Sequence, residues 1–327
     1  MGKKSKRGSG PRPGSNRAER VAARKARQIA ALAPPPRPFG GLAAECDLVA
    51  LRTFVASATA RVDLVEPGPP APELTSVLAD DDDAPLREVV PGVRNEVTLA
   101  TVLPGAIPAL VRETRDIPEG FVGLQTEPDR VELGAELAAA IEWAAHAKPG
   151  EQFGPTSSPD LLDIVKADAP LDITVYEDFS WWFPPGTDVP PEIAEMFERA
   201  NDSVLPTARL QTAAGVGAPW WVDAGERAHL RWIRPEPEDD LMTALARLHA
   251  AGRLTLGEGS RFAGSFRTHG LLVSVFDLDN EMHHEEWYPG VDQFETWLGD
   301  ALAQTAPLTP DERSSRDGIR GRQVTLR

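Results

Sequence analysis

A ten-residue segment, DLDNEMHHEE at residues 277–286, holds the densest group of potential metal ligands in the chain. Carboxylate and imidazole side chains together bind divalent metals in many proteins. The spacing differs from that of an HExxH zinc helix, and Met282 and Tyr288 stand where a calcium-binding loop needs glycine and glutamate. Two explanations stay open, which are a solvated turn and a metal site formed by Asp277, Asp279, His283 and His284.

Other catalytic motifs are incomplete. The glycine runs GVG at Gly215 and GEG at Gly257 do not complete a phosphate-binding fingerprint, and the chain contains neither a Gly-Lys-Ser/Thr P-loop nor a GxSxG nucleophile elbow. Cys46 falls in a helical pattern with no histidine near it in sequence, which is typical of a small core residue. We therefore expect no cofactor and a non-catalytic protein. The catalytic alternative is a metal-dependent hydrolase that uses residues 277–286.

A basic arm at the N-terminus is the strongest functional signal. Residues 1–28 contain ten Lys or Arg and one acid, Glu19, whereas the whole chain has a net charge of −16. Flexible basic side chains neutralise phosphates with little need for shape, so the arm predicts salt-sensitive binding to RNA, the ribosome or another acidic partner. The residues expected to bind are Lys3, Lys4, Lys6, Arg7, Arg17, Arg20, Arg24, Lys25 and Arg27. A solubilising tail, or one that folds back on the acidic body, is the alternative.

The composition of the arm predicts little stable structure. Residues 1–14 are rich in Gly, Ser, Pro and basic residues, which favours disorder in the free chain. Over residues 17–32, apolar and basic side chains lie on opposite faces of a helical pattern, and the prolines of APPPRP end it. We expect an arm over residues 1–36 that is disordered to helical.

Two further units follow from the hydrophobic periodicity. Residues 37–150 predict a first unit with helices at 45–58 and 131–147 and with strands at 61–66, 96–104 and 121–126. Residues 151–305 predict a second, Trp-rich unit with helices at 191–201, 238–251 and 291–302, strands at 172–177, 219–224 and 228–233, and a hairpin at 261–278. A linker-like composition around Gly150 separates the units, and residues 306–327 predict a flexible tail.

The predicted fold is therefore α+β, with two sheet-and-helix units behind a disordered basic arm. A faint similarity links DLVALRTFVASATARVDLVE, from Asp47, to DLMTALARLHAAGRLTLGE, from Asp240. Each of these segments precedes two predicted strands and a helix. A divergent duplication and chance both explain this similarity.

Seven of the eight tryptophans follow Gly150, and four of them form the adjacent pairs Trp181–Trp182 and Trp220–Trp221. Adjacent residues of a strand point to opposite faces, so one ring of each pair can be buried while the other is exposed. Exposed rings in this half would suit a protein or peptide partner. Packing between layers of the fold is the alternative.

Composition also predicts the compartment. One cysteine cannot form an intrachain disulfide, and secreted proteins of this size usually contain several. The basic start is not followed by an apolar segment, and the chain contains no run of about 18 apolar residues. We therefore expect a cytoplasmic protein with no membrane partner.

Three segments carry a family resemblance, namely PRPFGGLAAECDLVALR from Pro36, GERAHLRWIRP from Gly225 and RFAGSFRTHGLLVSVFDL from Arg261. Together they resemble an actinobacterial family of uncharacterised proteins, a domain of unknown function. The resemblance spans nearly the whole chain and implies a cytoplasmic protein with a basic start. It implies no activity, cofactor or site residue. Our hypothesis is an adaptor or chaperone-like binding protein.

Overall fold

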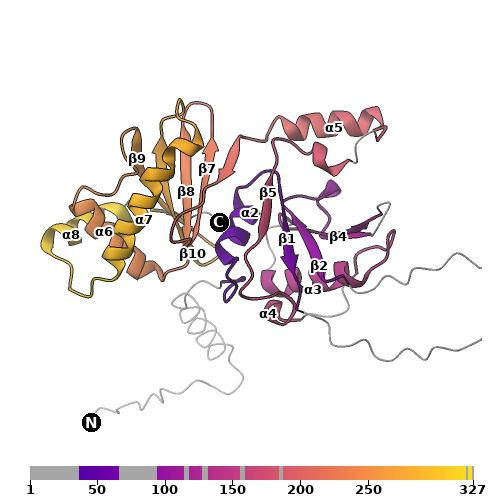
Figure 1. Cartoon of the computed structure of the whole chain (residues 1–327), viewed down its shortest axis with the longest axis horizontal. Helices are drawn as coiled ribbons and strands as arrows, with labels where there is room; N and C mark the ends of the chain where they lie inside the picture. The colour runs from indigo at the N-terminus through magenta and orange to yellow at the C-terminus, as the bar shows by residue number, and fades with distance from the viewer. Residues whose placement is uncertain are drawn as a thin grey trace, which may run out of the picture. The chain divides into compact units, whose positions relative to one another are not determined.

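A computed structural model describes residues 37–65, 94–113, 118–126, 132–154, 159–183, 187–321 and 323–325. The basic arm lies outside these residues, so the predictions about its nine Lys and Arg positions stay predictions. Contacts divide the chain into residues 1–36 and a body of residues 37–327. Two sheets with their helices make up the body and confirm the predicted α+β fold with two sheet-and-helix units (Figure 1).

The first sheet is built around β1 (Ala58–Asp63), in which buried and more exposed residues alternate. From its exposed face, Arg61 donates a hydrogen bond of 2.7 Å to Asp172 on the neighbouring strand. The order across the sheet is β3 (Ala109–Arg112), β4 (Glu119–Gly123), β2 (Glu96–Ala100), β1 and β5 (Asp172–Val175). Among the described residues of this sheet, β2 and β4 pair in parallel and the other neighbours are antiparallel.

Helices and 3₁₀ turns precede, separate and follow these strands along the chain. They are α2 (Glu45–Thr53), α3 (Leu133–His146), α4 (Leu161–Ile164) and the 3₁₀ turns η1 (Pro104–Ala106) and η2 (Ser180–Trp182). Buried side chains of α3 recur at the helical spacing that the sequence predicts, and they include Leu137, Ile141 and Ala144. Strand β5 comes from beyond Gly150, and its pairing with β1 places residues 172–175 in the first sheet.

The second sheet has six strands. Their order is β11 (Gln323–Thr325), β9 (Ser260–Thr268), β10 (Leu271–Leu278), β8 (Ala228–Arg234), β7 (Ala218–Asp223) and β6 (Thr207–Arg209). All neighbours are antiparallel except β11, which runs parallel to β9. The two sheets differ in strand order and strand number, and the divergent duplication stays a prediction.

The predicted hairpin of β9 and β10 is confirmed. Its two turn residues, His269 and Gly270, have positive φ angles of 46° and 77°. Positive φ at both central positions is the signature of a type I′ turn, whose twist matches that of the flanking strands. Thr268 and Leu271 face each other directly across the turn.

Both faces of the second sheet are covered. Helices α6 (Glu238–Ala250), α7 (Tyr288–Leu302) and α8 (Pro310–Arg320) gather at one face, where Leu245, Phe276 and Phe294 form part of a buried core (Figure 1). On the other face, Trp220 and Ile233 join a second core that contains side chains of α2 and of the first sheet. The two sheet units of the body therefore share one of their cores.

The helix α8 lies in the region that the sequence predicts as a flexible tail. Its first turn closes a capping box, in which the Glu312 N–H donates to Thr309 Oγ1 and the Thr309 N–H donates to the Glu312 carboxylate. Ile319 is buried in the core beneath the helices. Arg247 of α6 donates to the carbonyl oxygens of residues 301, 304 and 306. The prediction omitted this helix, although the TPDE motif at residues 309–312 is a recognisable helix start.

Helix α5 (Pro191–Asn201) is confirmed at its predicted residues. Within the part of the chain that the structure describes, no helix has the length and apolar character needed to cross a bilayer.

Candidate functional site

The candidate metal segment runs from the end of β10 through a turn into η3 (His284–Trp287) and α7. Phe276 and Leu278, on either side of Asp277, are buried in the core beneath the helices. Because successive side chains of a strand point to opposite faces, Asp277 points to the face away from those helices. His284 contacts Trp221, which belongs to the core beneath the helices, at 5.6 Å between ring centroids. Asp277 therefore points away from the face on which His284 lies.

Asp277 is held by three cationic or basic side chains. Arg261 donates a hydrogen bond of 2.5 Å to its Oδ2, Arg227 lies 3.2 Å from the same oxygen, and His229 Nδ1 lies 3.2 Å from Oδ1. Burial favours the neutral carboxyl and so raises the pKa of Asp277. The hydrogen bond from Arg261 and the positive charges around the carboxylate outweigh burial, and the net pKa is below its ordinary value. This aspartate is the centre of a cross-strand ion-pair cluster.

The other three predicted ligands follow β10. Asp279 uses Oδ1 to accept a hydrogen bond of 3.0 Å from the Glu281 N–H, as in an Asx turn. His283 and His284 lie together, with ring centroids 4.0 Å apart, and Glu285 Oε2 lies 3.7 Å from His283 Nδ1. The structure thus brings the two histidines together with Glu285, which the sequence reasoning did not include in its ligand set.

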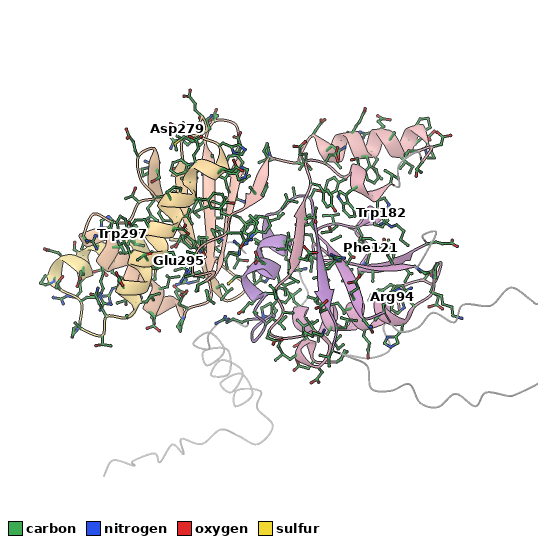
Figure 2. All side chains as sticks on the ribbon, in the orientation of Figure 1. Arg94, Phe121, Trp182, Asp279, Glu295 and Trp297 are labelled. Carbon is green, nitrogen blue, oxygen red and sulfur yellow. The ribbon has the colours of Figure 1, made fainter. Side chains whose placement is uncertain are left out.

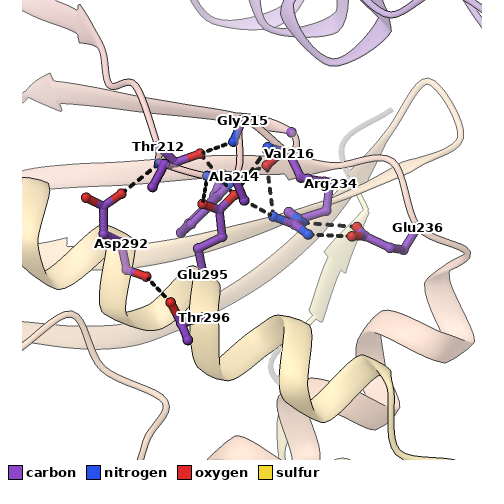
Figure 3. Close-up of polar contacts among 12 residues, drawn as sticks. Thr212, Ala214, Gly215, Val216, Arg234, Glu236, Asp292, Glu295 and Thr296 are labelled. Atoms are coloured by element: carbon purple, nitrogen blue, oxygen red, sulfur yellow. Dashed lines mark hydrogen bonds and ion pairs between the residues drawn. The ribbon is translucent and has the colours of Figure 1, made fainter.

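A buried carboxylate, Glu295 of α7, organises the loop between β6 and β7. It accepts hydrogen bonds from Thr212 Oγ1 at 2.9 Å, from the Ala214 N–H at 3.0 Å and from the Val216 N–H at 3.2 Å (Figure 3). The buried Arg234 guanidinium lies 3.8 Å from Glu295 and donates to the Val216 carbonyl oxygen at 2.8 Å. The sequence reasoning missed Glu295. Glu295 could have been recognised in the sequence, because it is a charged residue at a core-facing position of the helical pattern over residues 291–302.

This loop borders a cleft of about 970 Å³ that α2, β5 and β6 also line. Asp47, which lines this cleft, accepts hydrogen bonds from Arg209 at 2.7 Å and from the indole N–H of Trp220 at 3.2 Å. Burial raises the pKa of Cys46 to about 12, with smaller contributions from the charges of Glu45 and Asp47. The thiol is therefore neutral at physiological pH and is a poor nucleophile.

The two tryptophan pairs differ in burial. Trp220 and Trp221 are both buried, at 1% and 7% exposure, so the prediction of one exposed ring is wrong for this pair. The physical reason is that β7 has a core on each of its faces. Trp181 and Trp182 are both half-buried against Phe121; Figure 2 labels Trp182 and Phe121. The Arg112 guanidinium lies over the rings of Phe121 and Trp182. Both pairs mainly serve packing, which is the alternative that the sequence left open.

Helix α5 carries two of the large apolar side chains that are exposed among the described residues. None of its residues is buried, and Phe197 contacts Phe183 with ring centroids 4.6 Å apart. Ile193 and Met196 are 38% and 48% exposed, and Leu205, shortly after the helix, is 44% exposed. Because residues three apart lie on the same side of a helix, Ile193 and Met196 form one apolar stripe. No other element of the described structure buries this stripe. Helical spacing in the sequence could not predict that it would be exposed.

Comparison with known families assigns the chain to a family. The family model of DUF5926, described as a family of unknown function, matches residues 38–327. The chain belongs to this family. The match includes both sheet units and all the surfaces described above, and it confirms the resemblance seen in the sequence. No curated protein and no solved structure matches the chain. Membership of DUF5926 supplies no activity, so a functional proposal must rest on the geometry of these surfaces.

Proposed function

We propose that this protein is a non-catalytic cytoplasmic adaptor that binds a protein partner on α5 and docks through its basic arm on RNA, the ribosome or another acidic partner. The observation that carries the proposal is the open apolar stripe of α5, which comprises Ile193 and Met196. Globular proteins usually bury such a stripe against another element, and an exposed one marks an interaction surface. The single, buried Cys46 agrees with a reducing compartment.

The charges around the stripe indicate the kind of partner. Glu192, Glu195 and Glu198 follow the helix beside Ile193 and Met196, and Glu195 also pairs with Arg199 at 2.8 Å. A partner that covers the apolar stripe would meet these carboxylates at its rim, where opposite charge favours encounter and like charge opposes it. The partner we propose is therefore an amphipathic protein segment that carries Lys or Arg beside its apolar residues.

The arm gives the proposal its second contact. The chain's net charge of −16 includes ten Lys or Arg and one acid within residues 1–28, so residues 29–327 carry −25. A body of that charge repels nucleic acid, whereas the arm attracts it. In this proposal the arm binds nucleic acid or another acidic partner electrostatically, and the body binds the protein partner.

Removal of residues 1–32 is expected to abolish recovery of RNA or ribosomal proteins. The measurement is a pulldown from native lysate, with and without nuclease, that compares the full chain with the truncated one. A second variant carries glutamine at the nine named Lys and Arg positions, which keeps the arm's length and brings the net charge of residues 1–28 to zero, because Arg12 and Glu19 remain. We expect this variant to behave like the truncation, because phosphate contacts supply this kind of binding. Equal recovery of partners by the full chain and the truncated chain would remove the tether from the proposal.

Substitution of the stripe, Ile193→Ser with Met196→Ser, is expected to weaken partner binding about tenfold or more, which corresponds to about 1.4 kcal/mol. The probe is a synthetic amphipathic helix of leucine and lysine, and the readout is fluorescence anisotropy with the full chain. An otherwise identical leucine–glutamate helix tests the charge argument and should bind more weakly. Unfolding free energy should change by less than about 0.5 kcal/mol, because both side chains are already exposed.

A matched control for the stripe is Leu162→Ser. Leu162 lies on α4 of the first unit, is 44% exposed and is not part of the stripe. The α5 proposal requires that this variant bind the leucine–lysine helix as the unmodified chain does. Equal losses in the stripe variant and the Leu162 variant, or equal binding of the two helices, would contradict it.

A further inference from the structure

The turn before α7 presents three potential metal ligands from consecutive residues. One donor atom from each of His283, His284 and Glu285 can be chosen so that all three lie within 4.8 Å of one another. Rotation of exposed side chains can bring donors at this separation onto one ion. The set contains two imidazoles and one carboxylate, which is a donor set that zinc, nickel and copper prefer over calcium or magnesium.

Hydrogen bonds within the turn fix its backbone without a bound metal ion. The Glu286 N–H donates to the His283 carbonyl oxygen at 3.0 Å, and the His283 N–H donates to Glu286 Oε1 at 2.8 Å. Immediately afterwards, Trp287 is buried at 2% exposure and anchors the start of α7. Because hydrogen bonds hold its backbone from both sides, this turn loses little backbone conformational freedom when an ion binds, and only the side chains of the three residues become ordered.

Solvent can reach the three side chains, and the neighbouring residues decide which other side chains can join them as ligands. The side chains of His283 and Glu285 are 61% and 73% exposed, so an ion can enter from solvent and water can complete its coordination. His284 is more covered and packs its ring beside Trp221. Asp277 is excluded, because it points to the other face of the sheet and is held by Arg261 and Arg227. Asp279, which is labelled in Figure 2, marks the place where the chain leaves β10 and enters the segment that leads to this turn.

We propose that His283, His284 and Glu285 form a binding site for a divalent transition-metal ion, with zinc as the reference ion. The ligand set differs from the one predicted from sequence, since Glu285 replaces the two aspartates. No reaction is assigned to the site, and the proposal is independent of the adaptor function.

The test is titration of the full chain with Zn²⁺ in a calorimeter. A second titration with Cu²⁺ follows tryptophan fluorescence, because copper bound at His284 would quench the neighbouring Trp221. We expect saturable binding of one ion per chain. His283→Ala with His284→Ala should weaken it by more than about 100-fold, since changes to outer-shell partners alone cost about 10- to 100-fold. Glu285→Gln should weaken it by a smaller factor.

Two controls separate this site from other histidines and from the aspartates. His249→Ala removes an exposed histidine that bonds Ser315 Oγ on α8 at 2.9 Å, and it should leave the titration unchanged. Asp277→Asn should also leave zinc affinity unchanged. The proposal is overturned if the full chain shows no saturable binding, if the double histidine variant binds as well as the unmodified chain, or if Asp277→Asn weakens binding as much as the double variant does.

Discussion

Replacement of Glu295 by alanine is expected to lower the free energy of unfolding by about 3–5 kcal/mol, the usual cost of removing one partner from a buried charged network. The carboxylate is 6% exposed and accepts three hydrogen bonds from the loop at residues 212–216. Without it, two backbone N–H groups of the loop lose their acceptor. Arg234, whose side chain is 4% exposed, loses one of its two neighbouring carboxylates and keeps its ion pair with Glu236. The loop should also lose its fixed position beside the cleft.

The measurement is urea unfolding followed by tryptophan fluorescence. Asp292→Ala is the matched control, because Asp292 lies one turn earlier on α7 and its carboxylate accepts a hydrogen bond of 2.9 Å from the exposed Ala213 N–H. We expect this control to cost about 1 kcal/mol, as for an ordinary hydrogen bond. Glu295→Gln should fall between the two, since an amide oxygen still accepts hydrogen bonds. Similar losses for Glu295→Ala and Asp292→Ala would contradict the role given to the buried network.

Gly290→Ala is expected to destabilise the protein by about 3 kcal/mol, the upper part of the usual range for overpacking. A Cβ at position 290 would lie 1.9 Å from the carbonyl oxygen of Leu256 and 2.9 Å from its carbonyl carbon. The atoms in the way are backbone, so no change of rotamer can relieve the clash. Helix α7 would have to move away from residues 254–257, and the core that Val291 and Phe294 share would open.

Gly299→Ala tests the same substitution in the same helix. A Cβ at position 299 would meet no other atom within 4 Å. Glycine in a helix interior costs about 0.5–1 kcal/mol relative to alanine, so this variant should be stabilised by about that amount. Thermal unfolding should therefore show the two variants shifting the melting temperature in opposite directions. Shifts of the same sign would contradict the close approach of α7 to Leu256.

Local patterns were sufficient for much of the fold. Two apolar runs on either side of the turn residues Thr268, His269 and Gly270 predicted the hairpin of β9 and β10. The spacing of Val291, Phe294 and Leu298 predicted α7, and these side chains are buried. Such elements follow from periods of two or 3.6 residues, which can be read along a single segment. Strand β3 was not predicted from the sequence.

The candidate ligand set was only partly predictable. Adjacency in sequence sufficed to place His283 beside His284. It could not show that Asp277, six residues earlier, points to the other face of the sheet and binds Arg261. The pairing partner of Asp277 lies on a neighbouring strand, and its identity depends on the register of β9 against β10. Likewise, Glu295 could be recognised as an unusual helix residue, but the loop that it holds is about 80 residues away.

The sequence by itself determined the α+β character of the body, the positions of most helices and strands, and the separation of charge between a basic arm and an acidic body. Tertiary structure alone decided that Trp220 and Trp221 are both buried, that α8 packs on α6, and that α5 keeps Ile193 and Met196 exposed. The physical reason is that periodicity specifies which face of an element is apolar. What covers that face depends on contacts between residues far apart in the chain.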